Sequence, residues 1–293
     1  MSKGQRNHYV PEFYLKQWGD PQKGGRLAEY CRRYKGVEAR STYPGGTGYA
    51  HGLYTFSDLP QAAATFLEDH FFRRSDDAAH AILQELLQDR VNLDADKRSA
   101  WSRFIMTLFH RSPEGVARIR QRVLDGYPVQ LERMREQYPT LRHPGDPATF
   151  DDFLTTVTDA TFQELTLRVL QQSMDSRTIG NHINNLQWGV IRVHRLDYTL
   201  LTSDRPIVMS NGMIHPRSHI VMPISPDRVF VATDTLQTMQ DIHAIFQNAK
   251  KPVEVLNDRV VRQARKFVWA RDAQQLRFVQ NRLGEKARWS SFE

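Results

Sequence analysis

The segment Gln187-Trp188-Gly189-Val190-Ile191-Arg192-Val193 decides the fold class, because the hydrophobic pattern of the chain changes there. Before this segment, apolar residues recur about every four positions, which is typical of helices. From this segment onward, β-branched and apolar residues come in short runs with a period of two, which favours strands. The sequence therefore predicts an α+β fold, a helix-rich domain packed with a small, mostly antiparallel sheet.

The sheet region is predicted over 186–233 and the helical region over 60–184. Further strands are expected at 198–202, 207–209, 220–223 and 229–232, with a turn at Pro226-Asp227. Helices are expected over 60–90, from the cap at Asp94 to the break near Pro113, and over 114–138, 148–173 and 176–184.

Both ends of the chain also show patterned segments. A short helix is expected over 11–18 and a hairpin over 26–42, turning at Lys35-Gly36. Two helices are expected at 236–249 and 252–266, within a C-terminal region of helices and basic tail that spans 236–293. The length of 293 residues suits one large domain or two intimate ones, and we expect one domain over 1–293.

Composition indicates a soluble, cytoplasmic protein with no membrane partner. Hydrophobic residues make up 40% of the 293 residues and charged residues 25%, which is sufficient for a globular core. No apolar run approaches the roughly twenty residues of a membrane span. The single cysteine, Cys31, excludes an internal disulfide and a cysteine-based metal cage.

The net charge of +7 is concentrated near the C-terminus. Nine basic residues lie between Arg259 and Arg288, opposed only by Asp272 and Glu285. Such a segment favours RNA, DNA or an acidic protein as partner, although a solvated helix face is the plainer alternative. The candidate nucleic-acid-binding residues are Arg259, Arg262, Arg265, Lys266 and Arg271. The aromatic residues among them would either stack on bases or form the buried side of an amphipathic helix.

Several blocks, taken together, resemble a known family. They are His8-Tyr9-Val10-Pro11, Leu67-Glu68, Arg111-Ser112-Pro113, Thr202-Ser203-Asp204-Arg205-Pro206, Pro223-Ile224-Ser225-Pro226 and Asn257 ahead of Ala264-Arg265-Lys266-Phe267-Val268. Their order and spacing over residues 7–270 are similar to the bacterial family called domain of unknown function 4238 (DUF4238). The resemblance implies one full-length domain whose blocks converge in space, and it implies no activity.

The polar residues of these blocks suit phosphodiester cleavage. The candidate catalytic residues are His8, Glu68, Arg111 and Asp204. The imidazole of His8 would act as a base near working pH, and the guanidinium of Arg111 would stabilise the negative charge of the transition state. Alternatively, the carboxylates with His8 would hold a divalent cofactor, Mg²⁺ or Mn²⁺, that activates water.

Each candidate also has a structural alternative. His8 would be a hydrogen-bonded core histidine, Glu68 a helix cap, Arg111 a partner of helix-end carbonyls and Asp204 a turn residue. The sequence thus predicts a nuclease or phosphodiesterase that acts on nucleic acid. A non-catalytic nucleic-acid-binding module, or a scaffold that docks an acidic partner, remains open, as do the cofactor and the oligomeric state.

Overall fold

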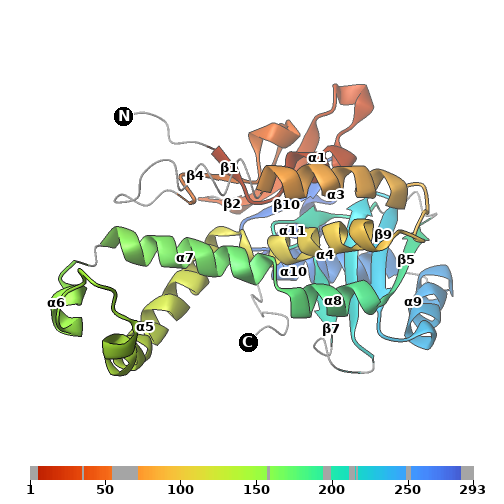
Figure 1. The fold of residues 1–293 in the computed structure, drawn as a ribbon. Helices are drawn as coiled ribbons and strands as arrows, with labels where there is room; N and C mark the ends of the chain where they lie inside the picture. Colours follow the sequence, from red (N-terminus) through yellow and green to blue (C-terminus); the bar gives the residue numbers. More distant parts are fainter. Residues whose placement is uncertain are drawn as a thin grey trace.

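The fold was obtained as a computed structural model, shown in Figure 1. It describes residues 6–34, 36–54, 72–156, 159–193, 199–210, 215, 217–248 and 252–284. The architecture is α+β, as the sequence predicts, with every strand pair antiparallel among the described residues.

The central sheet has the strand order β5-β9-β8-β7. These strands are β5 (Gln187–Arg192), β7 (Val208–Ser210), β8 (His219–Ser225) and β9 (Arg228–Thr233). The turn predicted at Pro226-Asp227 joins β8 to β9, which pair antiparallel from His219 opposite Thr233 to Ser225 opposite Arg228. The sheet region is confirmed for these four strands.

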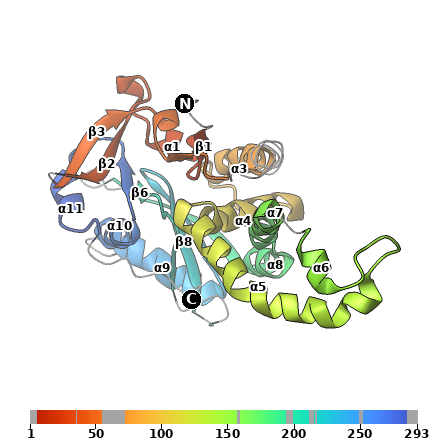
Figure 2. The ribbon, with the colours of Figure 1, turned by 90° about the vertical axis from the view of Figure 1, so that its left-hand side faces the viewer.

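Helices cover both faces of this sheet, which makes three layers. Phe230 and Ala232 pack on one side with α3 (Arg73–Leu86), α4 (Ala95–His110) and α8 (Arg177–Asn185). The alternate residues Val229 and Val231 pack on the other side with α9 (Leu236–Asn248) and α10 (Pro252–Gln263). Figures 1 and 2 show the sheet between these two groups of helices. Burial on both faces explains why β9 reads as an unbroken apolar run.

A second sheet has the order β3-β2-β10-β6 and joins distant parts of the chain. The predicted hairpin is confirmed as β2 (Leu27–Arg33) and β3 (Gly36–Thr42). Strand β10 (Phe267–Ala270) lies between β2 and β6 (Thr202–Ser203). Strand β10 is not among the strands that the sequence predicts. The helix that the sequence predicts over 252–266 is too long, because α10 ends at Gln263.

The strand predicted over 198–202 is also wrong in extent, since only Thr202–Ser203 forms a strand in the described part of that segment. The backbone N–H of Leu200 donates to the carbonyl of Pro226, at 2.8 Å, and the N–H of Leu201 donates to the Asn257 side chain, at 2.8 Å. These donors are therefore satisfied by a turn and a side chain instead of a neighbouring strand.

The N-terminal segment is fixed in the core. Strand β1 (Arg6–His8) pairs with β4 (Tyr49–His51), and the predicted helix over 11–18 is α1 (Glu12–Leu15) followed by the 3₁₀ turn η1 (Lys16–Trp18). The hydroxyl of Tyr14 donates to the carbonyl of Pro223, at 2.6 Å, and the indole of Trp18 donates to that of Leu200, at 2.8 Å. Two further 3₁₀ turns are η2 (Pro21–Lys23) and η3 (Pro44–Gly46).

The helices α4 and α5 (Pro113–Leu141) meet at a capped turn, as Pro113 predicts. Asp94 caps α4, where its carboxylate accepts from the N–H of Lys97 at 2.9 Å, and Ser112 caps α5 by accepting from Gly115 at 3.0 Å. Gly115 is required here, because a Cβ atom would lie 2.5 Å from the carbonyl oxygen of His110.

The helix predicted over 148–173 is two helices, α6 (Phe150–Leu154) and α7 (Asp159–Met174). Thr155 and Thr156 follow α6, and their hydroxyls donate to the carbonyls of Asp152 and Phe153, which competes with continuing the helix. The short helix predicted over 176–184 is confirmed as α8, and α11 (Leu276–Gln280) is the last described helix. Within the described ranges, no helix is long and apolar enough to cross a membrane.

Candidate functional site

Arg111 is fully buried and fixes the N-terminal segment. It is 0% exposed. Its Nε donates to the carbonyl of Tyr9 at 2.9 Å, and its Nη1 and Nη2 donate to the two carboxylate oxygens of Asp76 at 2.9 and 3.3 Å. The structure thus places Arg111 in a bidentate ion pair, and all three donors hold other parts of the fold together.

His8 lies beside this ion pair, on the edge of a small hollow. The hollow has a volume of about 310 Å³ and is also lined by Glu12, Phe72 and Asp76. The imidazole packs edge-on against Tyr49, with 5.5 Å between the ring centroids. Burial lowers the pKa of His8, so the ring is neutral at neutral pH. Its catalytic role stays a prediction, and Glu68 lies outside the described residues.

Asp204 is held in a turn after β6. Its Oδ1 accepts from the N–H of Arg265 at 2.9 Å, and its Oδ2 accepts from Lys266 at 2.6 Å and Phe267 at 3.1 Å. The sequence left open a role within the local turn, whereas these donors belong to the distant segment that leads from α10 into β10. Burial raises the pKa of Asp204 to about 6, because loss of water outweighs the three N–H donors.

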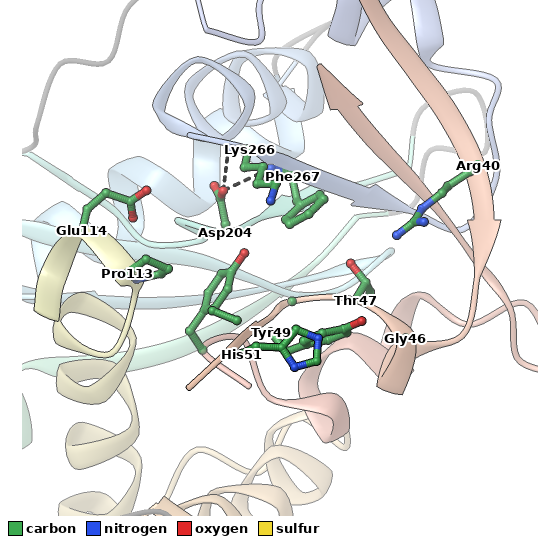
Figure 3. Close-up of a pocket in the computed structure, with 13 residues that line it drawn as sticks. Arg40, Gly46, Thr47, Tyr49, His51, Pro113, Glu114, Asp204, Lys266 and Phe267 are labelled. Carbon is green, nitrogen blue, oxygen red and sulfur yellow. Dashed lines mark hydrogen bonds between the residues drawn. The ribbon is translucent and has the colours of Figure 1, made fainter. Parts of the chain in front are cut away.

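Asp204 also lines a cavity of about 570 Å³. Figure 3 shows the cavity, with Asp204 and Glu114 above and Tyr49 and His51 below. Lys266 and Tyr9 line the same cavity, and the phenol of Tyr9 has its pKa raised by burial and by the neighbouring charge of Asp204. With Arg40, polar groups from six parts of the sequence surround one hollow.

A buried network supports the cavity wall. Glu29 is 0% exposed and accepts from the guanidinium of Arg40, at 3.1 Å, and from the hydroxyl of Thr47. The indole of Trp269 donates to the Thr47 hydroxyl at 3.0 Å. These contacts join β2, β3, the segment before β4 and β10, so that Arg40 and Thr47 face the cavity in fixed positions.

The structure brings together only part of the predicted catalytic set. His8 and Arg111 are neighbours around Asp76, whereas Asp204 lies in the larger cavity. The backbone of Tyr9 connects the two places, because Arg111 binds its carbonyl and its side chain lines the larger cavity. The sequence does not point to Glu114 or His51, because their positions in the cavity depend on neighbours that no local pattern reveals. Lys266 was predicted only as part of the basic segment.

The predicted nucleic-acid surface is partly neutralised. Arg262 donates to Asp258 at 2.9 Å, and Arg282 donates to the same carboxylate at 2.7 Å. The side chains of Arg259, Arg265, Lys266 and Arg271 are exposed. Phe267 and Trp269 lie buried in β10, so neither stacking on bases nor the predicted helix describes them.

A metal site is not formed by the residues that the structure describes. In these ranges, no group of three or more His, Cys, Asp or Glu side chains is placed to hold a metal ion. The Mg²⁺ or Mn²⁺ site suggested by the sequence includes Glu68, so it falls partly outside these ranges. It stays a prediction.

Comparison with known proteins places the chain in a family. No curated protein and no solved structure matches it. The family DUF4238, described as a protein of unknown function, matches residues 6–274, which include every described residue that lines the Asp204 cavity. The resemblance inferred from the sequence blocks is therefore confirmed, and the chain belongs to the DUF4238 family.

Proposed function

We propose that this chain is a phosphodiesterase that cleaves nucleic acid, with the reaction in the Asp204 cavity. The observation that carries the proposal is a buried carboxyl group with a pKa of about 6 on the wall of a cavity of about 570 Å³, which the cationic side chain of Lys266 also lines. A general base works best when its pKa lies near the working pH.

Asp204 keeps one acceptor position for this role. Each carboxylate oxygen has two lone pairs. Among the residues that the structure describes, Oδ2 accepts two backbone N–H groups, whereas Oδ1 accepts one, that of Arg265. The second lone pair of Oδ1 can accept a proton from a water molecule or a ribose hydroxyl in the cavity. Because three N–H groups fix the carboxylate, its position would change little during the reaction.

Lys266 is suited to bind the phosphate. Its ammonium group lies 5.0 Å from the centre of the Phe267 ring, and the side chain is exposed at the cavity. A cation next to the reacting group stabilises the negative charge of the transition state. Arg265 and Arg271 are also exposed and would attract the phosphates of a longer strand.

The test is cleavage of labelled single-stranded RNA and DNA, with Mg²⁺, with Mn²⁺ and with a chelator. We expect Asp204→Asn to lower the rate by about 10²-fold or more, as for loss of a general base. Glu114→Gln and Lys266→Met should also lower the cleavage rate. Both variants are expected to fold, because within the described residues neither side chain makes a hydrogen bond or an ion pair. Asp94→Asn is the control, since this exposed cap makes the same chemical change away from the cavity.

Cleavage that persists undiminished in Asp204→Asn, Glu114→Gln and Lys266→Met would refute the assignment of the cavity. If no substrate is cleaved under any condition, the exposed cations favour the second candidate, a nucleic-acid-binding module without catalysis. In that case the affinity for a labelled strand should fall steeply as salt is raised. Affinity that is independent of salt would exclude this candidate too.

A further inference from the structure

A second polar hollow lies where α4, α5, α7 and α8 meet. Its volume is about 370 Å³. The polar residues that line it are His110, Arg118, Arg122, Gln172, Ser173 and Ser176. It is separate from the Asp204 cavity, although both lie beside the junction of α4 and α5. His110 and Gly115 line this second hollow, whereas Pro113 and Glu114 line the Asp204 cavity.

Two guanidinium groups, those of Arg118 and Arg122, line this hollow. Arg118 and Arg122 are four residues apart on α5, so their side chains lie on the same face of the helix. No aspartate or glutamate is among the lining residues, and no carboxylate pairs with Arg122 in the part of the chain that the structure describes. Burial and these two arginines lower the pKa of His110 to about 4, as expected in a positive environment.

Neutral hydrogen-bonding groups complete the lining. Gln172 and Ser173 come from the face of α7 that is directed toward α5. Ser176 caps α8, whose N-terminus carries the positive end of the helix dipole. The apolar side chains of Ile119, Val169 and Ile179 form the remaining walls. Apolar walls lower the local dielectric and strengthen the attraction of the guanidinium groups for an anion.

We propose that this hollow is an anion-binding site that takes a phosphoryl group, held by the paired guanidinium groups of Arg118 and Arg122. Guanidinium groups bind phosphate oxygens in a fork geometry, and the amide of Gln172 supplies further donors. The phosphoryl group is either free phosphate or a phosphate of a nucleotide chain. This inference does not rest on the proposed reaction in the Asp204 cavity.

The test is isothermal titration of the full chain with inorganic phosphate, and separately with a short thymidine oligonucleotide, at constant ionic strength set with chloride. We expect binding that Arg122→Gln weakens at least about tenfold and that Arg118→Gln with Arg122→Gln weakens further. Arg120→Gln on the same helix is the matched control, because it removes the same charge outside the lining, and it should leave the affinity unchanged within about twofold.

Binding of phosphate alone would identify a free anion as the ligand, and tighter binding of the oligonucleotide through the same two arginines would identify a strand. Absence of phosphate-specific binding at millimolar concentration would overturn the proposal. Equal loss of affinity in Arg120→Gln would also overturn it, because a diffuse charge effect would then suffice. Because Arg122 is exposed, the single variant Arg122→Gln is expected to fold. It keeps the test valid if the variant with both arginines replaced fails to fold.

Discussion

The buried ion pair of Arg111 provides the most direct test of the fold around the N-terminal segment. Arg111→Met keeps most of the length of the side chain but removes all three donors, leaving the carboxylate of Asp76 and the carbonyl of Tyr9 without them. Breaking a buried pair by removing one partner costs about 3–5 kcal/mol. Asp76 keeps 23% of its side chain exposed, so we expect a loss of about 4 kcal/mol in the free energy of unfolding.

Urea denaturation followed by tryptophan fluorescence measures this loss. Arg103→Met is the matched control, in the helix α4 that ends directly before Arg111. Its partner Asp175 is 49% exposed and Arg103 itself is 40% exposed, so the change should stay below about 1 kcal/mol. Adding Asp76→Leu to Arg111→Met should recover about half of the loss, because no unpaired charge remains.

The pH dependence of Arg111→Met follows from Asp76. Burial already raises the pKa of this carboxyl group, and loss of the arginine raises it further. A raised folded-state pKa contributes stability at low pH that is lost as the pH rises through it. The defect of Arg111→Met should therefore shrink on acidification. If Arg111→Met costs no more than Arg103→Met, the assignment of Arg111 as a structural anchor is refuted.

Three further results are expected. If Asp204 is the general base, the cleavage rate should fall as the pH drops through about 6, since protonation removes the base; a flat profile from neutral pH to pH values well below this would contradict the role. Gly115→Ala should lower the free energy of unfolding by about 2 kcal/mol because its Cβ would meet the His110 backbone, and a neutral result in the denaturation assay would show that the turn can adjust. Tyr14→Phe should cost about 2 kcal/mol, since the buried hydroxyl bonds to both Thr202 and Pro223, whereas the same change at exposed Tyr43 should cost almost nothing.

Local patterns determined much of the secondary structure. The cap at Asp94, the break before Pro113 and the turn at Pro226-Asp227 are encoded by side chains that act on their own backbone or on residues a few positions away. The hairpin over 26–42 is similarly local, because its strands are adjacent in sequence. The sequence blocks also sufficed to identify the family.

Contacts between distant segments were decided only by the tertiary structure. Strand β10 follows α10 without a clear change of pattern, and it becomes a strand because β2 and β6 supply hydrogen-bonding partners from far along the chain. The position of Asp204 depends on the same strand, since its carboxylate binds the backbone of residues 265–267. Glu114 and His51 reach the same cavity from other segments, α5 and β4. A side chain's neighbours across a sheet are set by pairing and packing of remote segments, which no local periodicity specifies.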